Sequence, residues 1–286
     1  MSKSLSDLLA ILNLETIEPS VFRGKSPNTG WPQVFGGQLI GQALVAACRS
    51  VRGRLPHSLH CYFMQPGDPH IPIIYRVECL RDGRSYSTRR VNALQRGQAI
   101  FSIMVSFHVG EKGAFDHQEE MPDVAAPEKL TAEEIRKQPP FPGMSEFIRH
   151  YYECERPIEL RPVEIGRFVG HTARDGRINI WMKATAKLPE DPALHFCALA
   201  YASDFSVRDP IVVRHGRTLF DDRITPLSLD HAMWFHRPFR ADEWLLYAQE
   251  SPSAQGGRGL ARGLIFQPDG TLVASVAQEG AVRDRP

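Results

Sequence analysis

The sequence has no long apolar run and almost no net charge. None of its apolar stretches approaches the ~18–20 residues that a membrane-spanning helix needs. The formal net charge is +1, and no cluster of basic residues forms the footprint of a nucleic-acid-binding protein. We therefore expect a protein with no membrane span and no nucleic-acid partner.

Cysteine is scarce as well. The five cysteines are odd in number and scattered, and no two of them have Cys-x-x-Cys spacing. This argues against a disulfide framework and against the common zinc sites. The sequence predicts buried free thiols in a reducing compartment, with no metal and no cofactor.

Targeting signals are also missing. Leu5, Leu8, Leu9 and Leu12 recur at helical spacing near the N-terminus, which indicates a helix of the fold rather than a signal peptide. The sequence ends in Arg-Asp-Arg-Pro, which is not the Ser-Lys-Leu peroxisomal address. We expect a cytoplasmic protein.

The main feature that the sequence does have is an internal repeat. When the sequence is slid by 172 positions, residues 62–108 lie over residues 234–280 without a gap. Solenoid repeats are ~20–50 residues long, so a repeat of this length indicates two fused copies of one domain. We expect an N-terminal domain at 1–112, a linker at 113–154 and a C-terminal domain at 155–286. Identical residues at matched places include Phe63 and Phe235, Tyr75 and Tyr247, Glu78 and Glu250, and Arg90 and Arg262.

Each copy has one apolar helix and several strands. Residues 39–47 are apolar nearly all round and rich in small side chains, which indicates a buried helix. In the second copy, Asp191 is a helix N-cap with Pro192 at the first helical position, and the helix runs to about Asp204. A polar stretch near 110–143 separates the copies, with a short helix near 132–137. Alternation and turn residues predict strands at 58–64, 73–80, 85–94, 99–107, 158–163, 179–184, 228–235, 244–250, 259–266 and 271–278.

These elements indicate an α+β architecture. An antiparallel sheet wrapped around one long apolar helix is the hot-dog arrangement, and two fused copies form a double hot dog. A sandwich or a barrel would leave both buried helices unexplained.

Several stretches of the sequence form distinctive motifs, which are Val34–Gln38, Arg81–Gly83 with Arg89–Val91, Tyr201–Asp204, Asp230–Phe239 and Ala277–Gly280. Together they resemble the acyl-CoA thioesterase II family, whose bacterial members are TesB-like. The resemblance covers nearly the whole chain. It implies a double hot-dog fold, hydrolysis of fatty acyl-CoA thioesters without a metal, and a homodimer or homotetramer assembled through the sheets. It also implies that Asp204, Ser228 and Gln278 together orient and activate a water molecule.

Asp204 is the one member of this trio that can accept a proton at neutral pH. Thioester hydrolysis needs an aligned water, a proton acceptor and donors for the developing oxyanion. Asp204 lies near the C-terminal end of an apolar helix, where the helix dipole and desolvation both disfavour the charged form of the side chain. A carboxylate in such a place accepts a proton more readily and is therefore a better general base. From position alone, an ordinary turn residue after a helix is the better interpretation of Asp204, and the family resemblance reverses this preference.

The other two members are suited to positioning. The carboxamide of Gln278 neither gains nor loses a proton near pH 7, and alternation places it on one strand face with Leu272, Ala274 and Val276. Its matched position in the first copy is Ser106, so the carboxamide belongs to the second copy alone. An exposed strand-end glutamine is the alternative. Ser228, which replaces a threonine of some family members, lacks the Gly-x-Ser-x-Gly elbow of a hydrolase nucleophile.

Other polar residues allow weaker interpretations. Arg258 and Arg262 are candidates for CoA phosphates. Gly36 and Gly37 begin a helix whose free N–H groups are candidates for binding an acyl carbonyl, although close helix–strand packing explains these glycines equally well. His231 and His236 are five apart on a strand and so face opposite ways, which favours structural histidines over a shared metal.

Two other functions fit parts of the sequence. A hot-dog enoyl-CoA hydratase would carry an Asn-Pro-x-His segment, and the sequence has none. A non-catalytic acyl-CoA-binding regulator would carry a DNA-binding segment, and no helix-turn-helix or basic arm is visible. Thiol release from acyl-CoA distinguishes a thioesterase from both.

Overall fold

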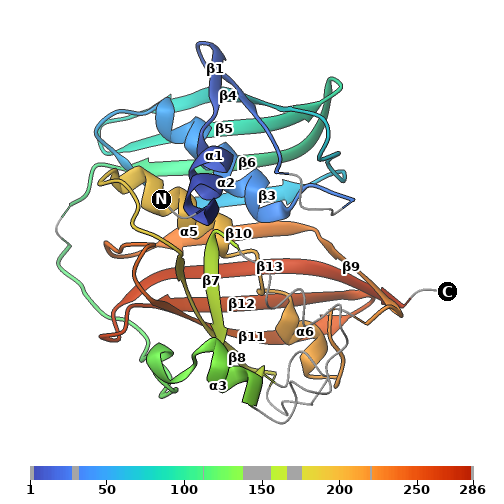
Figure 1. The fold of residues 1–286 in the computed structure, drawn as a ribbon. Helices are drawn as coiled ribbons and strands as arrows, with labels where there is room; N and C mark the ends of the chain where they lie inside the picture. Colours follow the sequence, from blue (N-terminus) through green and yellow to red (C-terminus); the bar gives the residue numbers. More distant parts are fainter. Residues whose placement is uncertain are drawn as a thin grey trace.

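A single antiparallel sheet runs through the whole molecule (Figure 1). The computed structural model describes residues 3–27, 32–111, 113–137, 156–165, 176–219 and 221–284. The first copy contributes β1 (Glu15–Glu18), β2 (Val21–Gly24), β3 (Leu55–Phe63), β4 (Ile73–Asp82), β5 (Tyr86–Gln95) and β6 (Gln98–His108). The second contributes β7 (Ile158–Pro162), β8 (Ile178–Ala184), β9 (Ile224–Ser228), β10 (Asp230–Phe235), β11 (Leu245–Gln255), β12 (Arg258–Phe266) and β13 (Leu272–Asp284).

The two copies meet at one strand pair. The strand order is β1-β2-β4-β5-β6-β3-β10-β13-β12-β11-β8-β7, and β9 also pairs with β13. β3 and β10 join the halves as antiparallel neighbours, with Tyr62 opposite Asp230 and Ser58 opposite Trp234. The duplication therefore gives one sheet with a pseudo-twofold axis at its centre.

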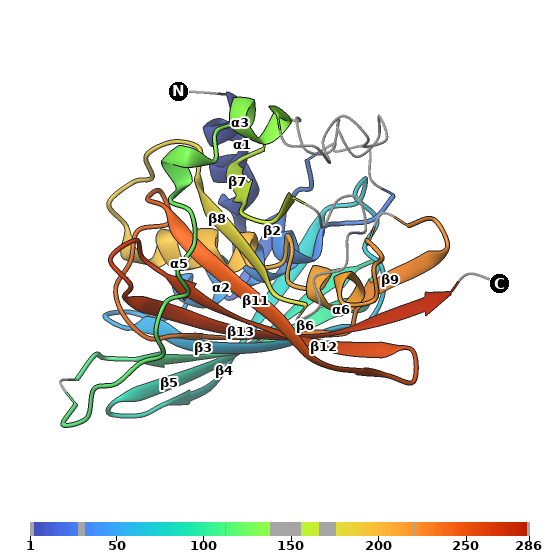
Figure 2. The same ribbon diagram turned by 90° about the horizontal axis from the view of Figure 1, so that it is seen from below.

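The sheet curves around two core helices (Figure 2). They are α2 (Gly36–Arg49) and α5 (Pro192–Ala202), and both are buried along most of their length. The remaining helical segments are α1 (Lys3–Leu12), η1 (Pro127–Lys129), α3 (Ala132–Lys137) and α6 (Asp209–Val213). Each copy is thus a buried helix wrapped by an antiparallel sheet, as the sequence predicts.

α2 and α5 run antiparallel in close contact. A Cβ added to Gly37 would lie 2.3 Å from the carbonyl oxygen of Tyr201, and one added to Gly41 would lie 3.1 Å from Cβ of Tyr201 and 3.3 Å from the carbonyl oxygen of Cys197. Glycine therefore allows the helix axes to approach. The predicted N-cap of α5 is confirmed, because Asp191 Oδ1 accepts a hydrogen bond from the Ala193 N–H at 3.0 Å.

The gapless alignment of the two copies is wrong in the last strand of each copy. Arg90 and Arg262 are 172 positions apart, but their cross-strand partners Met104 and Ala277 are 173 apart. The connection from β12 to β13 is therefore one residue longer than the connection from β5 to β6. A sliding comparison without gaps misses such an insertion.

Several other predictions need correction. The strand predicted at 228–235 is two strands that separate at Leu229, and α5 ends at Ala202 rather than near Asp204. β1, β2 and α6 were not predicted, because each has only four or five residues. Cys79 is exposed rather than buried, since it lies where β4 continues past the end of β2. Cys154 lies outside the described residues.

Candidate active site

The structure brings Asp204, Ser228 and Gln278 together. The Gln278 Nε2 group donates hydrogen bonds to Asp204 Oδ1 and to Ser228 Oγ, both at 3.0 Å. Gln278 is fully buried and Asp204 is only 5% exposed. One amide group thus joins the carboxylate and the hydroxyl in a place shielded from bulk water.

A β-bulge lets β9 and β10 present side chains to this place. Ser228 pairs with Gly280, whereas Ala232 pairs with Ala277. The four residue steps from Ser228 to Ala232 therefore lie opposite only three steps on β13. The extra residue is near Leu229, whose N–H donates to the carbonyl of Glu279 at 3.0 Å. Because of the bulge, Ser228 and His231 both face the core, although an odd spacing in a regular strand would send them to opposite faces.

Asp204 lies in a turn that is held from both sides. Ser203 caps the C-terminus of α5 and places Asp204 directly after it. The Tyr247 hydroxyl donates to the carbonyl of Ser203 at 3.2 Å, and Gln249 Nε2 donates to Ser206 Oγ at 2.9 Å. These bonds from β11 fix the segment that carries the carboxylate.

The second oxygen of Asp204 faces the start of α2. A Cβ added to Gly36 would lie 2.6 Å from Asp204 Oδ2, so only glycine leaves room for the carboxylate there. No side chain caps this end of α2. Its positive dipole end favours an anion nearby, which opposes the unfavourable C-terminus of α5. Gly36 therefore belongs to the site, whereas the packing against Tyr201 explains Gly37.

His231 is part of the same cluster, although the sequence pattern favours only a structural role for it. Its Nδ1 is 2.5 Å from Gln278 Oε1, and its Nε2 is 3.0 Å from Ser203 Oγ. The ring is fully buried, and burial lowers the pKa of His231 below its usual value. The signal that could have found it is strand register, which puts His231 beside Gln278.

His236 lies on the opposite face, as predicted. Its Nε2 is 2.8 Å from Ser275 Oγ, in an exposed position. Within the part of the chain that the structure describes, no three His, Cys, Asp or Glu side chains gather in a way that would hold a metal ion.

The two arginines suggested for CoA phosphates lie on the outer face of β12, away from the trio. Arg258 Nε is 3.1 Å from Glu279 Oε1, and Arg262 Nε donates to Glu250 Oε1 at 2.6 Å. Their contact with CoA stays a prediction.

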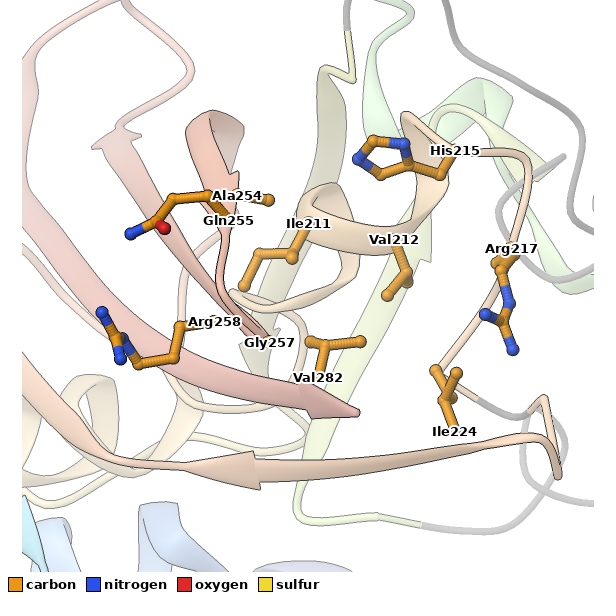
Figure 3. A pocket seen from close by; sticks show the side chains of 10 residues that line it. All are labelled: Ile211, Val212, His215, Arg217, Ile224, Ala254, Gln255, Gly257, Arg258 and Val282. Carbon is orange, nitrogen blue, oxygen red and sulfur yellow. The ribbon is translucent and has the colours of Figure 1, made fainter. Parts of the chain in front are cut away.

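Arg258 also lines a pocket whose walls include none of the trio (Figure 3). The pocket has a volume of about 190 Å³ and lies between α6, β9, the β11–β12 hairpin and the C-terminal end of β13. Its walls include Ile211, Val212, Ile224 and Val282. Ile224 and Val282 are each four residues from Ser228 and Gln278 along their strands, so this pocket is separate from the trio.

The first copy has apolar residues at the matched places. With the corrected register, the counterpart of Gln278 is Val105 and not Ser106. Val105 and Leu59 are fully buried in the first copy. The polar residues thus belong to the second copy alone, and the matched pairs are Gln278 with Val105, His231 with Leu59, and Ser228 with Pro56.

The N-terminal ends of α2 and α5 also differ between the two copies. The N-terminus of α5 is capped by Asp191, and Pro192 has no N–H to offer. The N-terminus of α2 begins Phe35-Gly36-Gly37 without a side-chain cap. Only one of the two pseudo-symmetric places therefore combines uncapped N–H groups with a carboxylate.

Comparisons with known proteins show the family of this chain. The family model described as "Acyl-CoA thioesterase" matches residues 147–281, and the one described as "Acyl-CoA thioesterase N-terminal domain" matches residues 25–108. The chain is 41% identical over 284 residues to "Acyl-CoA thioesterase 2" of Haemophilus influenzae, with 99% of each chain covered. The chain belongs to the acyl-CoA thioesterase family.

Solved structures of this thioesterase fold are similar along the whole chain. An acyl-CoA thioesterase II, TesB2, from Mycobacterium marinum has a TM-score of 0.80 and 39% identity, with 97% of this chain and 98% of that chain covered. A hot-dog protein of unknown function from Alicyclobacillus acidocaldarius has a TM-score of 0.76 at 18% identity, with 100% of each chain covered. The predictions of the family, of the double hot dog and of a thioester hydrolase are confirmed. The roles of the individual residues stay predictions.

Proposed function

We propose that Asp204, Ser228 and Gln278 hold and activate a water molecule that hydrolyses the thioester of a fatty acyl-CoA. The observation that carries this proposal is the buried Gln278 amide, which is bonded to the carboxylate and to the hydroxyl at once. The products are a free fatty acid and CoA.

Each side chain has a separate task in this reaction. Asp204 Oδ1 is occupied by Gln278, which leaves Oδ2 to accept the proton of the attacking water. Ser228 Oγ accepts the amide hydrogen bond, so its own hydrogen remains available to orient the water. Gln278 holds the two oxygens at a fixed spacing and takes up no proton.

The start of α2 provides the oxyanion donors in this proposal. Attack by water on the carbonyl carbon gives a tetrahedral oxyanion, and the N–H groups of Gly36 and Gly37 point from an uncapped helix end. Collapse of the intermediate breaks the C–S bond. The CoA thiolate leaves and takes up the proton that Asp204 received.

The test is thiol release from a panel of saturated acyl-CoAs, followed for the parent and for Asp204→Asn. We expect turnover by the parent and a loss of roughly 10²–10⁴-fold in kcat for the variant, since removal of a general base has this effect. The melting temperature of both proteins controls for folding. Unchanged turnover by Asp204→Asn would overturn the proposal. Retention of ligand without thiol release would indicate a binding protein, and conversion of enoyl-CoA without thiol release a hydratase.

We propose that copies of the chain assemble through the outer face of the sheet. Apart from Asp230, which lies opposite Tyr62, the side chains in the middle of this face are uncharged, and Tyr62 is 65% exposed. Ion pairs flank them on either side, Arg90 with Glu78 and Arg262 with Glu250. An exposed apolar group with a charged rim is typical of a protein interface. The central residues are His60, Tyr62, Met104 and Trp234.

The location in the cell and the division into domains are also proposals. No helix among the described residues is long and apolar enough to cross a membrane, and we propose the cytoplasm as the location. The division into domains at 1–112 and 155–286, with a linker at 113–154, likewise stays a proposal.

A further inference from the structure

We propose that His231 is a positioning residue that fixes the orientation of the Gln278 amide and so its bonds to Asp204 and Ser228. The inference rests on the proposed role of Gln278. The contact that carries it is the hydrogen bond between the His231 ring and the Gln278 carbonyl oxygen.

The orientation of the amide follows from its partners. A carboxylate only accepts hydrogen bonds, so the Gln278 atom that faces Asp204 is the NH₂ group. The carbonyl oxygen of the amide must then face His231, and that oxygen only accepts. Nδ1 of His231 therefore carries a hydrogen and donates it. If the amide turned over, its oxygen would meet the carboxylate, and its NH₂ group would meet a ring N–H.

The other ring nitrogen completes the arrangement. With the proton on Nδ1, a neutral imidazole has an acceptor at Nε2. The Ser203 hydroxyl is 3.0 Å from Nε2, and its single hydrogen can be donated either to Nε2 or to the Ala200 carbonyl oxygen at 2.9 Å. Ser203 is the C-cap of α5 and directly precedes Asp204. A closed chain of contacts thus connects Asp204 through Gln278 and His231 back to the residue next to Asp204.

Packing alone does not explain a histidine at this place. The matched residue in the first copy is Leu59, which is also fully buried on the inner face of its strand. The pseudo-symmetric sheet therefore accepts an apolar side chain there. What differs in the second copy is the neighbouring residue, since Leu59 has Val105 where His231 has Gln278.

The kinetic test compares His231→Leu with His231→Asn. Leucine copies the first-copy residue and removes the donor, and we expect kcat to fall roughly 10- to 100-fold, as on loss of an orienting partner, with KM within about twofold of the parent. The asparagine amide can replace Nδ1–H at a similar place, so we expect it to restore most of kcat. The matched control is His236→Leu on the outer face, for which we expect parental kcat. Equal kcat for the parent and His231→Leu would overturn the inference, and so would equal losses in the leucine and asparagine variants.

A spectroscopic measurement tests the same point without turnover. The ¹⁵N shifts of the ring in the folded parent report which nitrogen carries the hydrogen, and we expect Nδ1. Gln278→Val removes the acceptor, and we expect the tautomer balance of His231 to change. A hydrogen on Nε2 in the parent would overturn the inference.

The outcomes separate this inference from the proposed function. If Asp204→Asn and Gln278→Val both keep parental thiol release, the proposed function fails whatever His231 does. If both variants lose turnover while His231→Leu keeps it, only the role of His231 fails.

Discussion

At the residue scale, a few substitutions between the copies separate an apolar interior from one with a buried polar cluster. The first copy has Val105 and Leu59 where the second has Gln278 and His231. Buried polar groups are costly unless they are hydrogen-bonded, and each polar atom of the Gln278 amide has a partner. The second copy therefore tolerates the cluster because its members satisfy one another.

Gly36 provides a prediction at this scale. An alanine methyl would lie 2.6 Å from Asp204 Oδ2, so Gly36→Ala must displace the carboxylate. We expect kcat for acyl-CoA to fall by up to roughly 10²-fold, because small displacements of reacting groups have effects of this size. The measurement is steady-state thiol release.

Gly41→Ala is the matched control in the same helix. Its methyl meets Leu12 Cδ2 and Tyr201 Cβ at 3.1 Å, away from the carboxylate. We expect a change in melting temperature with kcat preserved. Equal loss of kcat in both variants would mean that Gly36 acts only through packing.

At the element scale, the sequence predicts the long elements and misses the local irregularities. Alternation, the Asp191 cap and the apolar run at 39–47 predict α2, α5 and most strands, because these patterns extend over most of each element. The bulge near Leu229 and the extra residue between β12 and β13 leave no mark in these patterns. These two irregularities determine which residues face Gln278. The sequence therefore predicts the trio through resemblance, and it does not predict His231.

Two buried histidines connect α5 to the rest of the second copy. His195 Nδ1 accepts from the Ala241 N–H at 3.1 Å, and His231 contacts Ser203. Burial lowers the pKa of both histidines below 6.5. Between the folded pKa and the unfolded value, the unfolded chain binds more protons, so stability rises with pH. Their contribution is complete above about pH 6.5 and is lost as the pH falls through the folded pKa.

We therefore predict that the melting temperature falls as the pH is lowered from about 7 to about 5. His231→Asn removes one of the two groups, so its melting temperature should depend less on pH over this range. Differential scanning calorimetry at a series of pH values measures both slopes. A melting temperature that stays constant or rises towards pH 5 would contradict this account.

At the scale of the whole molecule, duplication has given one sheet with one proposed catalytic site. Both copies supply it, because Gly36 comes from the first and the polar side chains come from the second. The chain as a unit is therefore needed for the chemistry, and we expect one acyl-CoA site in each chain.

The outer face provides a prediction about assembly. Tyr62→Asp places a second carboxylate opposite Asp230 in the middle of that face, and burying unpaired charges in an interface is strongly unfavourable. We expect the mass in solution to fall to that of one chain. Sedimentation velocity measures this, and an unchanged oligomer would place the interface elsewhere.

The central claim is that water, and not Ser228, attacks the thioester. The direct measurement is intact-protein mass spectrometry after millisecond acid quenching of the enzyme with acyl-CoA, together with the time course of thiol release. We predict the mass of the unmodified chain at every time, no initial burst of thiol, and residual turnover by Ser228→Ala. An acyl group on Ser228, which accumulates with a burst of thiol, would contradict the account.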